Sequence, residues 1–315
     1  MALSSVLLII GFAILIKSAS LLINGASSLA KRFSISELAI GLTIVAFGTS
    51  APELIVNIIS SASGHNEICF GNILGSNIFN TLMVLGIAGI IYPISIEKNT
   101  VKKEIPFLLV GTIFVLALVN NFGFIGHVLS RFDGIFLILS LILFFIYVVG
   151  IAKENMTDNI EIKLYSISKS VIFILIGIIG LFFGGEIVVR NAVFIARLLN
   201  VSEKFIAITI VALGTSLPEL VTSIIAIMKK RHGLAIGNVI GSNLFNIFLV
   251  LGVSSIINPI VFPLALNTDF YFLILITIIL FITMFTGKRR KLERAESIMF
   301  IILYIGYVVF LFYRK

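Results

Sequence analysis

Long runs of apolar residues, separated by short polar stretches, recur along the whole chain. Ten of these runs, at roughly 17–25 residues each, are long enough to cross a bilayer as helices. They lie near residues 3–23, 35–62, 68–92, 105–123, 133–152, 168–190, 203–228, 234–258, 269–286 and 296–313. The connections are short and leave no room for a soluble domain. The pattern therefore predicts an all-α integral membrane protein with ten transmembrane helices.

The chain contains an internal repeat at an offset of about 166 residues. Residues 36–93 align with 202–259 without a gap, with about 28 identities over some 58 positions. The offset places the second span on the seventh, an odd shift that reverses the direction in which the helix crosses the membrane. We expect two inverted five-helix repeats, 1–152 and 168–315, joined by a cytoplasmic linker, 153–167. Secondary transporters with inverted repeats bind their substrate between the halves, near the midplane.

Composition and charge agree with a membrane protein. The chain is 59% hydrophobic and 12% charged, with a mean hydropathy of +1.18, and soluble domains are only about 45–50% apolar. Most of its Lys and Arg residues follow odd-numbered spans, which predicts that those loops are cytoplasmic and that both termini face the outside of the cell membrane. Basic residues confined to such loops do not indicate nucleic-acid binding. The single cysteine, Cys69, excludes an intramolecular disulfide.

Each copy of the repeat contains a proline inside a predicted span. Pro52 and Pro218 lack the N–H that would bond the carbonyl four residues earlier, so they should interrupt their helices. Irregular backbone at membrane depth is tolerated where it is buried in protein or lines a wet cavity. Carbonyl oxygens freed there suit hard cations such as calcium and sodium.

A glutamate follows each of these prolines. Glu53 and Glu219 are carboxylates placed in the middle of a span, where a charge costs at least about 2.5 kcal/mol, and such residues commonly mark ion pathways. Helical spacing places further oxygen atoms on the same face as each carboxylate. For Glu53 these come from Ala46, Thr49 and Ser50, and for Glu219 from Ala212, Thr215 and Ser216.

The next span of each repeat has a polar stripe. Ser76 and Asn80, with Ser242 and Asn246 in the second copy, are expected to line the cavity that holds the carboxylates. Four more amides, at Asn72, Asn77, Asn238 and Asn243, either line this cavity or make hydrogen bonds between helices. A site built from oxygen ligands favours sodium or calcium over transition metals.

The paired segments G-T-S-x-P-E and G-N-x-x-G-S-N-x-F-N resemble the alpha repeats of the sodium/calcium exchanger family, within the cation/calcium antiporter superfamily. The resemblance implies that Glu53 and Glu219 are the central calcium ligands, aided by the carbonyls of Thr49 and Thr215, and that sodium shares them. It also implies a set of sodium contacts and two flanking amides. These are Ala46, Ser50, Ser76, Ala212, Ser216 and Ser242, with Asn80 and Asn246 flanking the centre.

The resemblance implies exchange of sodium for calcium by alternating access, with the first and sixth spans sliding across the other eight. Some relatives, including potassium-dependent ones, carry aspartate where this chain has Asn246. The linker is too short for the regulatory calcium-binding domains of animal exchangers, so a minimal, prokaryotic-type transport core is expected.

Two other readings of the same residues stay open. A calcium/proton antiporter could use both carboxylates in alternation, and a cation channel could use them as a constriction. The sequence contains no nucleophile elbow, phosphate loop or zinc motif, so we expect a transporter and not an enzyme. No cofactor is expected beside the transported Ca²⁺ and Na⁺, and no protein partner can be inferred beyond the lipid bilayer.

Overall fold

The computed structural model describes residues 2–120, 126–152, 162–201, 206, 212–286 and 290–314. Almost all of them are helical. The first half contains α1 (Ala2–Phe33), α2 (Glu37–Ile40), η1 (Gly41–Val45), α3 (Ala46–Thr49), α4 (Ala51–Ala62), α5 (Asn66–Phe79), η2 (Asn80–Val84), α6 (Leu85–Ile91), η3 (Thr100–Glu104), α7 (Ile105–Val119) and α8 (Arg131–Ile151). The second half contains α9 (Ile167–Leu198), α11 (Ala212–Gly214), α12 (Leu217–Met228), α13 (His232–Leu244), η6 (Phe245–Val250), α14 (Leu251–Ile257), η7 (Leu264–Leu266), α15 (Asn267–Thr283) and α16 (Arg294–Tyr313).

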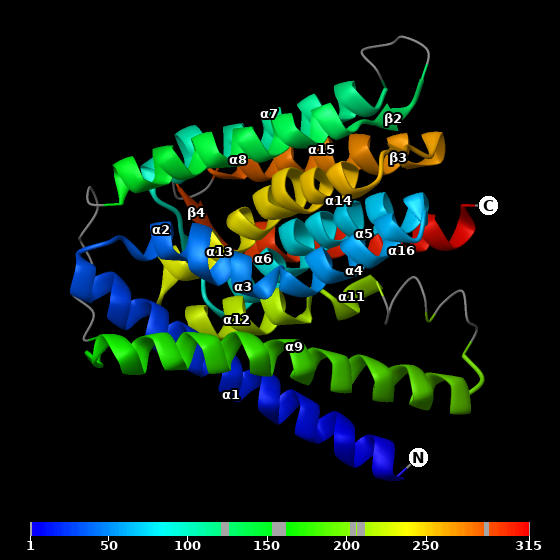
Figure 1. The fold of residues 1–315 in the computed structure, drawn as a ribbon. Coiled ribbons are helices and arrows are strands. Elements are labelled where there is room, and N and C mark those ends of the chain that lie inside the picture. The colour runs from blue at the N-terminus through cyan, green and yellow to red at the C-terminus, as the bar shows by residue number, and fades with distance from the viewer. Residues whose placement is uncertain are drawn as a thin grey trace.

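The helices run side by side, and the two termini lie at the same end of the bundle (Figure 1). Among the described residues, seven helices are long and apolar enough to cross a membrane, and the bent pair Glu37–Thr49 and Ala51–Ala62 is also long and apolar enough when taken as one span. The other two expected spans contain α7 and α12, which do not pass the same test of length and apolar character. The chain is thus a multi-pass helical membrane protein, and the full count of ten stays a prediction.

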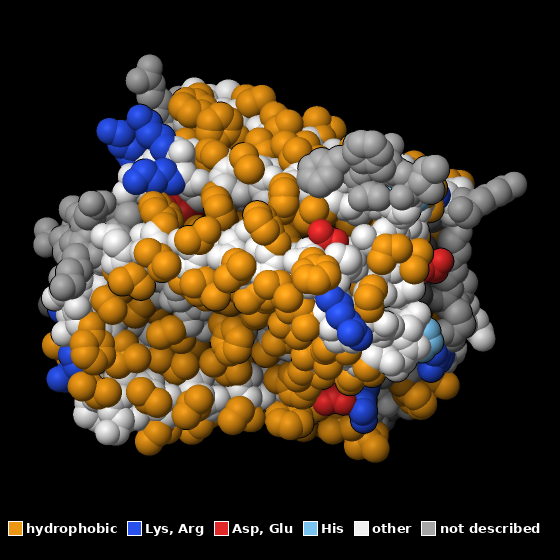
Figure 2. All heavy atoms as spheres, turned by 45° about the horizontal axis from the view of Figure 1, so that its top comes forward, with side chains coloured by type: hydrophobic (Ala, Val, Ile, Leu, Met, Phe, Trp, Pro, Cys, Tyr) orange, Lys and Arg blue, Asp and Glu red, His pale blue; other side chains and the backbone are white. Residues whose placement is uncertain are grey.

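Two helical columns form the centre of the bundle. In Asn66–Ile91 and His232–Ile257, 78% of the most apolar stretch is buried, compared with 22–33% in the other continuous spans. Lipid-facing helices expose apolar side chains because the bilayer is their solvent, as Phe132 on α8 does with 84% of its surface. Figure 2 shows the resulting band of hydrophobic side chains, with a cluster of Lys and Arg at its upper left margin.

Helices α1 and α9 lie together along one side of the bundle and pack on the helices beside them (Figure 1). Glycines allow their backbones to approach closely: a Cβ atom on Gly177 would lie 2.8 Å from the Cβ of Leu22, and one on Gly11 would lie 2.8 Å from Val188. The two contacts are related by the repeat offset, which joins Gly11 to Gly177 and Leu22 to Val188.

Two very short antiparallel strand pairs connect the halves of the chain. Strand β1 (Ile94–Ser95) pairs with β4 (Lys291–Leu292), and β2 (Val128–Leu129) pairs with β3 (Ile260–Val261). The β2–β3 pair lies at the same end of the bundle as the termini, and β4 lies toward the opposite end (Figure 1). Each half therefore contributes one strand at each end.

Candidate functional site

The predicted helix breaks are present in both copies of the repeat. Ser50 separates α3 from α4 with φ −83° and ψ 6°, and the axis bends there by 48°. Ser216 has nearly the same backbone angles, φ −90° and ψ 7°, immediately before α12. Pro52 and Pro218 lie in the first turn of the following helix, where the missing N–H has no intrahelical partner to lose. The interruption predicted from proline is therefore confirmed.

The breaks bring both glutamates to the start of a helix in the interior of the protein. Glu53 lies in the first turn of α4 and Glu219 in the first turn of α12, and neither has any exposed surface. The positive end of a helix dipole stabilises a carboxylate at this position. Both carboxylates thus receive electrostatic support from backbone N–H groups, and no described Lys or Arg forms an ion pair with either of them.

Serines from opposite halves connect the two carboxylates. The Ser216 hydroxyl donates to Glu53 Oε1 at 3.1 Å, and the Ser50 hydroxyl donates to Glu219 Oε1 at 3.1 Å. Ser76 on α5 adds a second hydrogen bond to Glu53 Oε1 at 3.3 Å. Each helix break therefore supplies a donor to the carboxylate of the other half, and the two glutamates belong to a single polar centre.

This centre retains acceptor oxygens that no donor satisfies. In the described residues, the buried atoms Glu53 Oε2, Glu219 Oε2, Asn80 Oδ1 and Asn246 Oδ1 have no hydrogen-bond partner. Burying such oxygens without a partner costs free energy, and a bound cation would offset that cost by coordinating them directly. No cluster of three or more His, Cys, Asp or Glu side chains occurs in the described part of the chain, so hydroxyl, amide and carbonyl oxygens must complete any cation shell.

The residues around the first-half break make several hydrogen-bond contacts in the interior of the protein. Thr49 is fully buried, and its hydroxyl lies 2.9 Å from Asn238 Oδ1 and 3.2 Å from the Ser242 hydroxyl. The Ala46 carbonyl accepts the Ser50 N–H at 3.0 Å, and the Thr49 oxygen lies 3.3 Å from the same carbonyl oxygen.

The second-half break is more open. Thr215 is partly exposed, and its hydroxyl contacts Asn72 Oδ1 at 3.4 Å. It lines a cavity of about 290 Å³ together with Pro52, Pro218 and, farther along α9, Glu186. Ala212 begins α11, but its side chain lies outside the described residues, as do most of positions 202–211 in the repeat.

The central asparagines join helices, an alternative that the sequence left open for Asn77 and Asn243, while Asn80 and Asn246 were expected to line the cavity. Asn80 donates to Asn243 Oδ1 at 3.2 Å and Asn246 donates to Asn77 Oδ1 at 3.0 Å. Asn77 also donates to the Asn243 carbonyl at 3.3 Å. The amide N–H groups of Asn80 and Asn246 donate to residues of the other half. These bonds hold the free oxygens of the two side chains in fixed orientations.

Sequence reasoning missed one supporting pair. Asn72 donates to Asn57 Oδ1 at 2.7 Å, and its repeat equivalent Asn238 donates to Ser223 at 3.0 Å. Asn57 and Ser223 lie one helical turn after the glutamates and are themselves related by the repeat offset. The sequence did contain a signal for this pair, because the position is polar in both copies of the repeat although the residue type differs.

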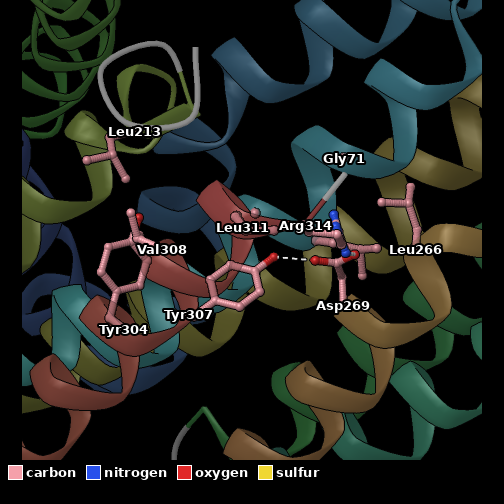
Figure 3. A pocket seen from close by; sticks show the side chains of 11 residues that line it. Gly71, Leu213, Leu266, Asp269, Tyr304, Tyr307, Val308, Leu311 and Arg314 are labelled. Atoms are coloured by element: carbon pink, nitrogen blue, oxygen red, sulfur yellow. Dashed lines mark hydrogen bonds and ion pairs between the residues drawn. The ribbon is translucent and has the colours of Figure 1, made fainter. Parts of the chain in front are cut away.

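A second cavity, of about 370 Å³, lies beside α5 and is lined by Gly71, Tyr304 and a cluster of Asp269, Tyr307 and Arg314 (Figure 3). Both oxygens of Asp269 are engaged there, by the Tyr307 hydroxyl at 2.5 Å and by Arg314 at 2.5 Å. The ion pair already compensates the charge of this carboxylate, and each of its oxygens has a hydrogen-bond partner. We therefore assign this cluster to the packing of α15 against α16.

A multi-pass helical bundle with two buried carboxylates at repeated helix breaks has the architecture of an ion transporter. The chain belongs to the sodium/calcium exchanger protein family, whose family model matches residues 3–150 and 169–313. The membership confirms the resemblance inferred from the two motif pairs.

Several known proteins are similar over nearly the full chain. The putative antiporter CaxA of Alkalimonas amylolytica is 35% identical, with 99% of both chains covered. The sodium/calcium exchanger MaX1 of Methanosarcina acetivorans is 29% identical, with 98% of both covered. A solved structure of the sodium-calcium exchanger NCX_Mj superposes with a TM-score of 0.84 at 32% identity and covers 98% of both chains. The similarity therefore extends over the whole fold.

Proposed function

We propose that this protein exchanges Na⁺ for Ca²⁺ across the cell membrane as a secondary active antiporter. The observation that carries the proposal is the crossed pair of hydrogen bonds, Ser216 to Glu53 and Ser50 to Glu219, which joins two buried carboxylates into one centre. Two carboxylates balance the charge of one Ca²⁺, and the oxygen-rich surroundings also suit Na⁺. Sodium/calcium exchange is the activity named for MaX1 and NCX_Mj.

Within this proposal the two ions share part of one ligand set. Glu53 and Glu219, with the carbonyls of Thr49 and Thr215, would hold calcium, and these groups would also hold sodium. Further sodium contacts would come from hydroxyl and carbonyl oxygens around them. The proposed sodium contacts are Ala46, Ser50, Ser76, Ala212, Ser216 and Ser242, with Asn80 and Asn246 flanking the centre.

The proposed topology has ten spans in two inverted halves. Strand pairing supports it: β1 and β3 are related by the repeat offset, yet they lie in different strand pairs, as expected if equivalent loops face opposite sides of the membrane. Loops rich in Lys and Arg would face the cytoplasm, which places both termini outside. Alternating access would come from α1 and α9 sliding as a unit over the central columns.

The proposed exchange is electrogenic and independent of potassium. Asn80 and Asn246 are neutral, so the centre holds two formal negative charges. Replacing one Ca²⁺ by more than two Na⁺ would then move net charge.

The decisive test is calcium uptake by vesicles containing the purified protein. Uptake driven by a sodium gradient at uniform pH is expected, with no requirement for potassium on either side. A pH gradient without sodium should produce no uptake. Uptake that ignores sodium but follows the pH gradient would replace this proposal by calcium/proton exchange, and uncoupled calcium flow would indicate a channel.

A further inference from the structure

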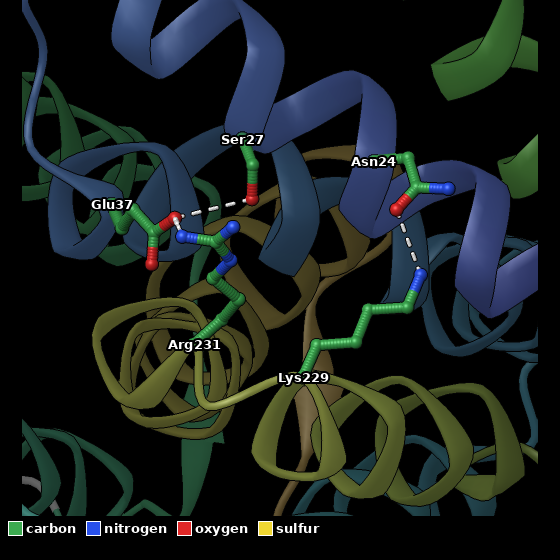
Figure 4. A network of polar contacts seen from close by, with 5 residues as sticks. All are labelled: Asn24, Ser27, Glu37, Lys229 and Arg231. Atoms are coloured by element: carbon green, nitrogen blue, oxygen red, sulfur yellow. Dashed lines mark hydrogen bonds and ion pairs between the residues drawn. The ribbon is translucent and has the colours of Figure 1, made fainter. Parts of the chain in front are cut away.

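One face of α1 carries three polar residues near the end of the bundle opposite the termini. Ser20, Asn24 and Ser27 are spaced by four and three residues, which places them on one side of the helix. Lys229, just past the end of α12, donates to the Ser20 carbonyl at 3.2 Å, to the Ser20 hydroxyl at 2.7 Å and to Asn24 Oδ1 at 2.8 Å. Figure 4 shows the ammonium group directed at α1. We call these three bonds the Lys229 clamp.

A second contact extends the seam between α1 and the central helices. The Ser27 hydroxyl donates to Glu37 Oε1 at 3.2 Å, and the same oxygen lies 3.3 Å from Arg231. Figure 4 draws both contacts beside the clamp. Partial burial, together with the nearby Arg231, lowers the pKa of Lys229, and hydrogen bonds from a partly desolvated cation are stronger than those in water.

Other residues on the same part of α1 bind α9 and Tyr165, which lies two residues before that helix. Ser28 contacts the Ser170 hydroxyl at 3.0 Å and accepts the Tyr165 N–H at 2.9 Å, while Arg32 donates to the Tyr165 carbonyl at 2.9 Å. With the close glycine contacts farther along, these bonds make α1 and α9 one packed unit. The Lys229 clamp therefore joins the pair of helices proposed to slide to the part proposed to stay fixed.

At the repeat-related positions that the structure describes, the clamp has no counterpart. The repeat offset relates Ser20 to Glu186, Asn24 to Arg190 and Lys229 to Ser63, and all three residue types differ. Glu186 and Arg190 pair with each other along α9 at 2.7 Å, and Ser63 is exposed. In the described part of the chain, no hydrogen bond joins Ser63 to either of them. That end instead has the 290 Å³ cavity, lined by Glu186 and Arg190, that reaches Thr215.

We propose that Lys229 is a positioning residue for transport, which clamps α1 to the central helices at the cytoplasmic end and favours the conformation open on the outer side. The proposal depends on the exchange cycle and orientation proposed above. Three hydrogen bonds present in one conformation and broken in the other give that conformation a population advantage. Because charged hydrogen bonds are among the stronger ones, an advantage of about tenfold is expected.

The test is to measure calcium half-saturation separately at each face of the membrane, for the wild-type protein and for Lys229→Met. If the outward-open form dominates, loss of the clamp increases the rare inward-open form by about tenfold. The calcium concentration that gives half-saturation at the cytoplasmic face should then fall by up to about tenfold. The corresponding concentration at the outer face should change by less than about twofold. General damage to the site would instead weaken binding from both sides.

Matched variants separate the clamp from charge and from folding. Lys230→Met removes the same charge from the adjacent exposed position and should leave both half-saturation values unchanged. Lys229→Arg should preserve the wild-type values, because a guanidinium can reach the same acceptors. Moving the clamp to the other end, with Ser63→Lys, Glu186→Ser and Arg190→Asn together, should raise half-saturation at the outer face.

A distance measurement tests the clamp even in a variant that does not transport. Spin labels at exposed positions Lys31 on α1 and Lys102 on η3, with Cys69→Ala, report the separation of α1 from the helices that are proposed to stay fixed. Lys229→Met should add a second distance population, and Lys230→Met should not. Unchanged distances together with unchanged half-saturation would overturn the proposal. Absence of sodium-driven uptake in the wild-type protein would instead refute the proposed exchange, and the distance result would still decide whether the clamp holds α1.

Discussion

The Ser216 hydroxyl donates to the Glu53 carboxylate at 3.1 Å and so links the helix break of the second half to the acidic residue of the first. The Ser50 hydroxyl reciprocates toward Glu219 at the same distance. A change at either carboxylate therefore alters a hydrogen bond made by the helix break of the other half. Neither half of the chain can form the polar centre by itself.

Glu53→Gln and Glu219→Gln should each abolish sodium-driven calcium uptake while the protein still folds. Each substitution removes one of two negative charges that balance calcium and keeps the side-chain volume, so packing is preserved. Vesicle uptake and the elution profile in detergent would be measured together. The control is Glu67→Gln on exposed α5 surface. Near-normal uptake by either central variant would show that its carboxylate is dispensable.

Ser50→Ala and Ser216→Ala should weaken apparent sodium affinity by about two- to tenfold. Each removes a proposed sodium ligand and a hydrogen bond to a buried carboxylate, an interaction worth about 0.5–1.5 kcal/mol or somewhat more when charged. Sodium titrations of calcium uptake would give the change. The two variants should behave alike because their hydrogen bonds are equal in length, and a large effect of one alone would argue against a shared centre.

Gly237→Ala should destabilise the protein, whereas its repeat equivalent Gly71→Ala should not. A Cβ atom at Gly237 would lie 2.7 Å from the Leu38 carbonyl and 2.8 Å from the Cα of Gly41, and overpacking of this kind costs about 1–3 kcal/mol. At Gly71, no atom of the described residues lies within 4 Å of that position. Thermal unfolding of the two variants in the same detergent checks this difference.

The sequence predicted the helix breaks and the paired glutamates well, because each depends on local chemistry that occurs twice. Pro52 and Pro218 have fixed covalent constraints, so their effect on a helix does not depend on distant residues. The partners of the central asparagines could not be predicted in the same way. Whether the Asn77 side chain faces a cavity or contacts Asn243 depends on how two helices, remote in the sequence, are rotated against each other. Sequence spacing does not fix that rotation.

The Lys229 clamp was beyond sequence reasoning for a different reason. Its partners lie about 205 residues earlier in the chain, and the residues involved fall where the repeat is not conserved between its copies. A lysine after a span also satisfies the positive-inside rule, which gives it a sufficient explanation without any partner. The asymmetry becomes visible when the two ends of the structure are compared residue by residue.

The proposed orientation predicts opposite labelling of two exposed positions, Lys103 in η3 and Arg131 at the start of α8. Single cysteines replacing Lys103 and Arg131, with Cys69→Ala, should react with a membrane-impermeant reagent only from the cytoplasmic side and only from the outer side, respectively. Both positions are exposed, so reagent access does not require a conformational change. Reaction of both from the same side would overturn the ten-span topology.

Sodium-driven calcium uptake should respond to membrane voltage. If more than two Na⁺ replace one Ca²⁺, a potential of 100 mV biases exchange by about 2.3 kcal/mol for each net charge moved. Uptake would be measured with the potential clamped, with and without potassium. Asn246→Asp adds a third carboxylate and should change this voltage response. An absolute requirement for potassium, or no effect of voltage, would contradict the proposed charge balance.

The strand pairs have a consequence for how such a molecule could arise. Strands β1 and β2 each find their partner in the other half, at opposite ends of the bundle. Two separate copies of one half, inserted in opposite directions, could make both pairings reciprocally, as in a closed two-fold dimer. In the proposed topology, the present chain has that geometry within a single polypeptide. The two copies need not be identical in one chain, as the unequal residues at positions 63 and 229 illustrate.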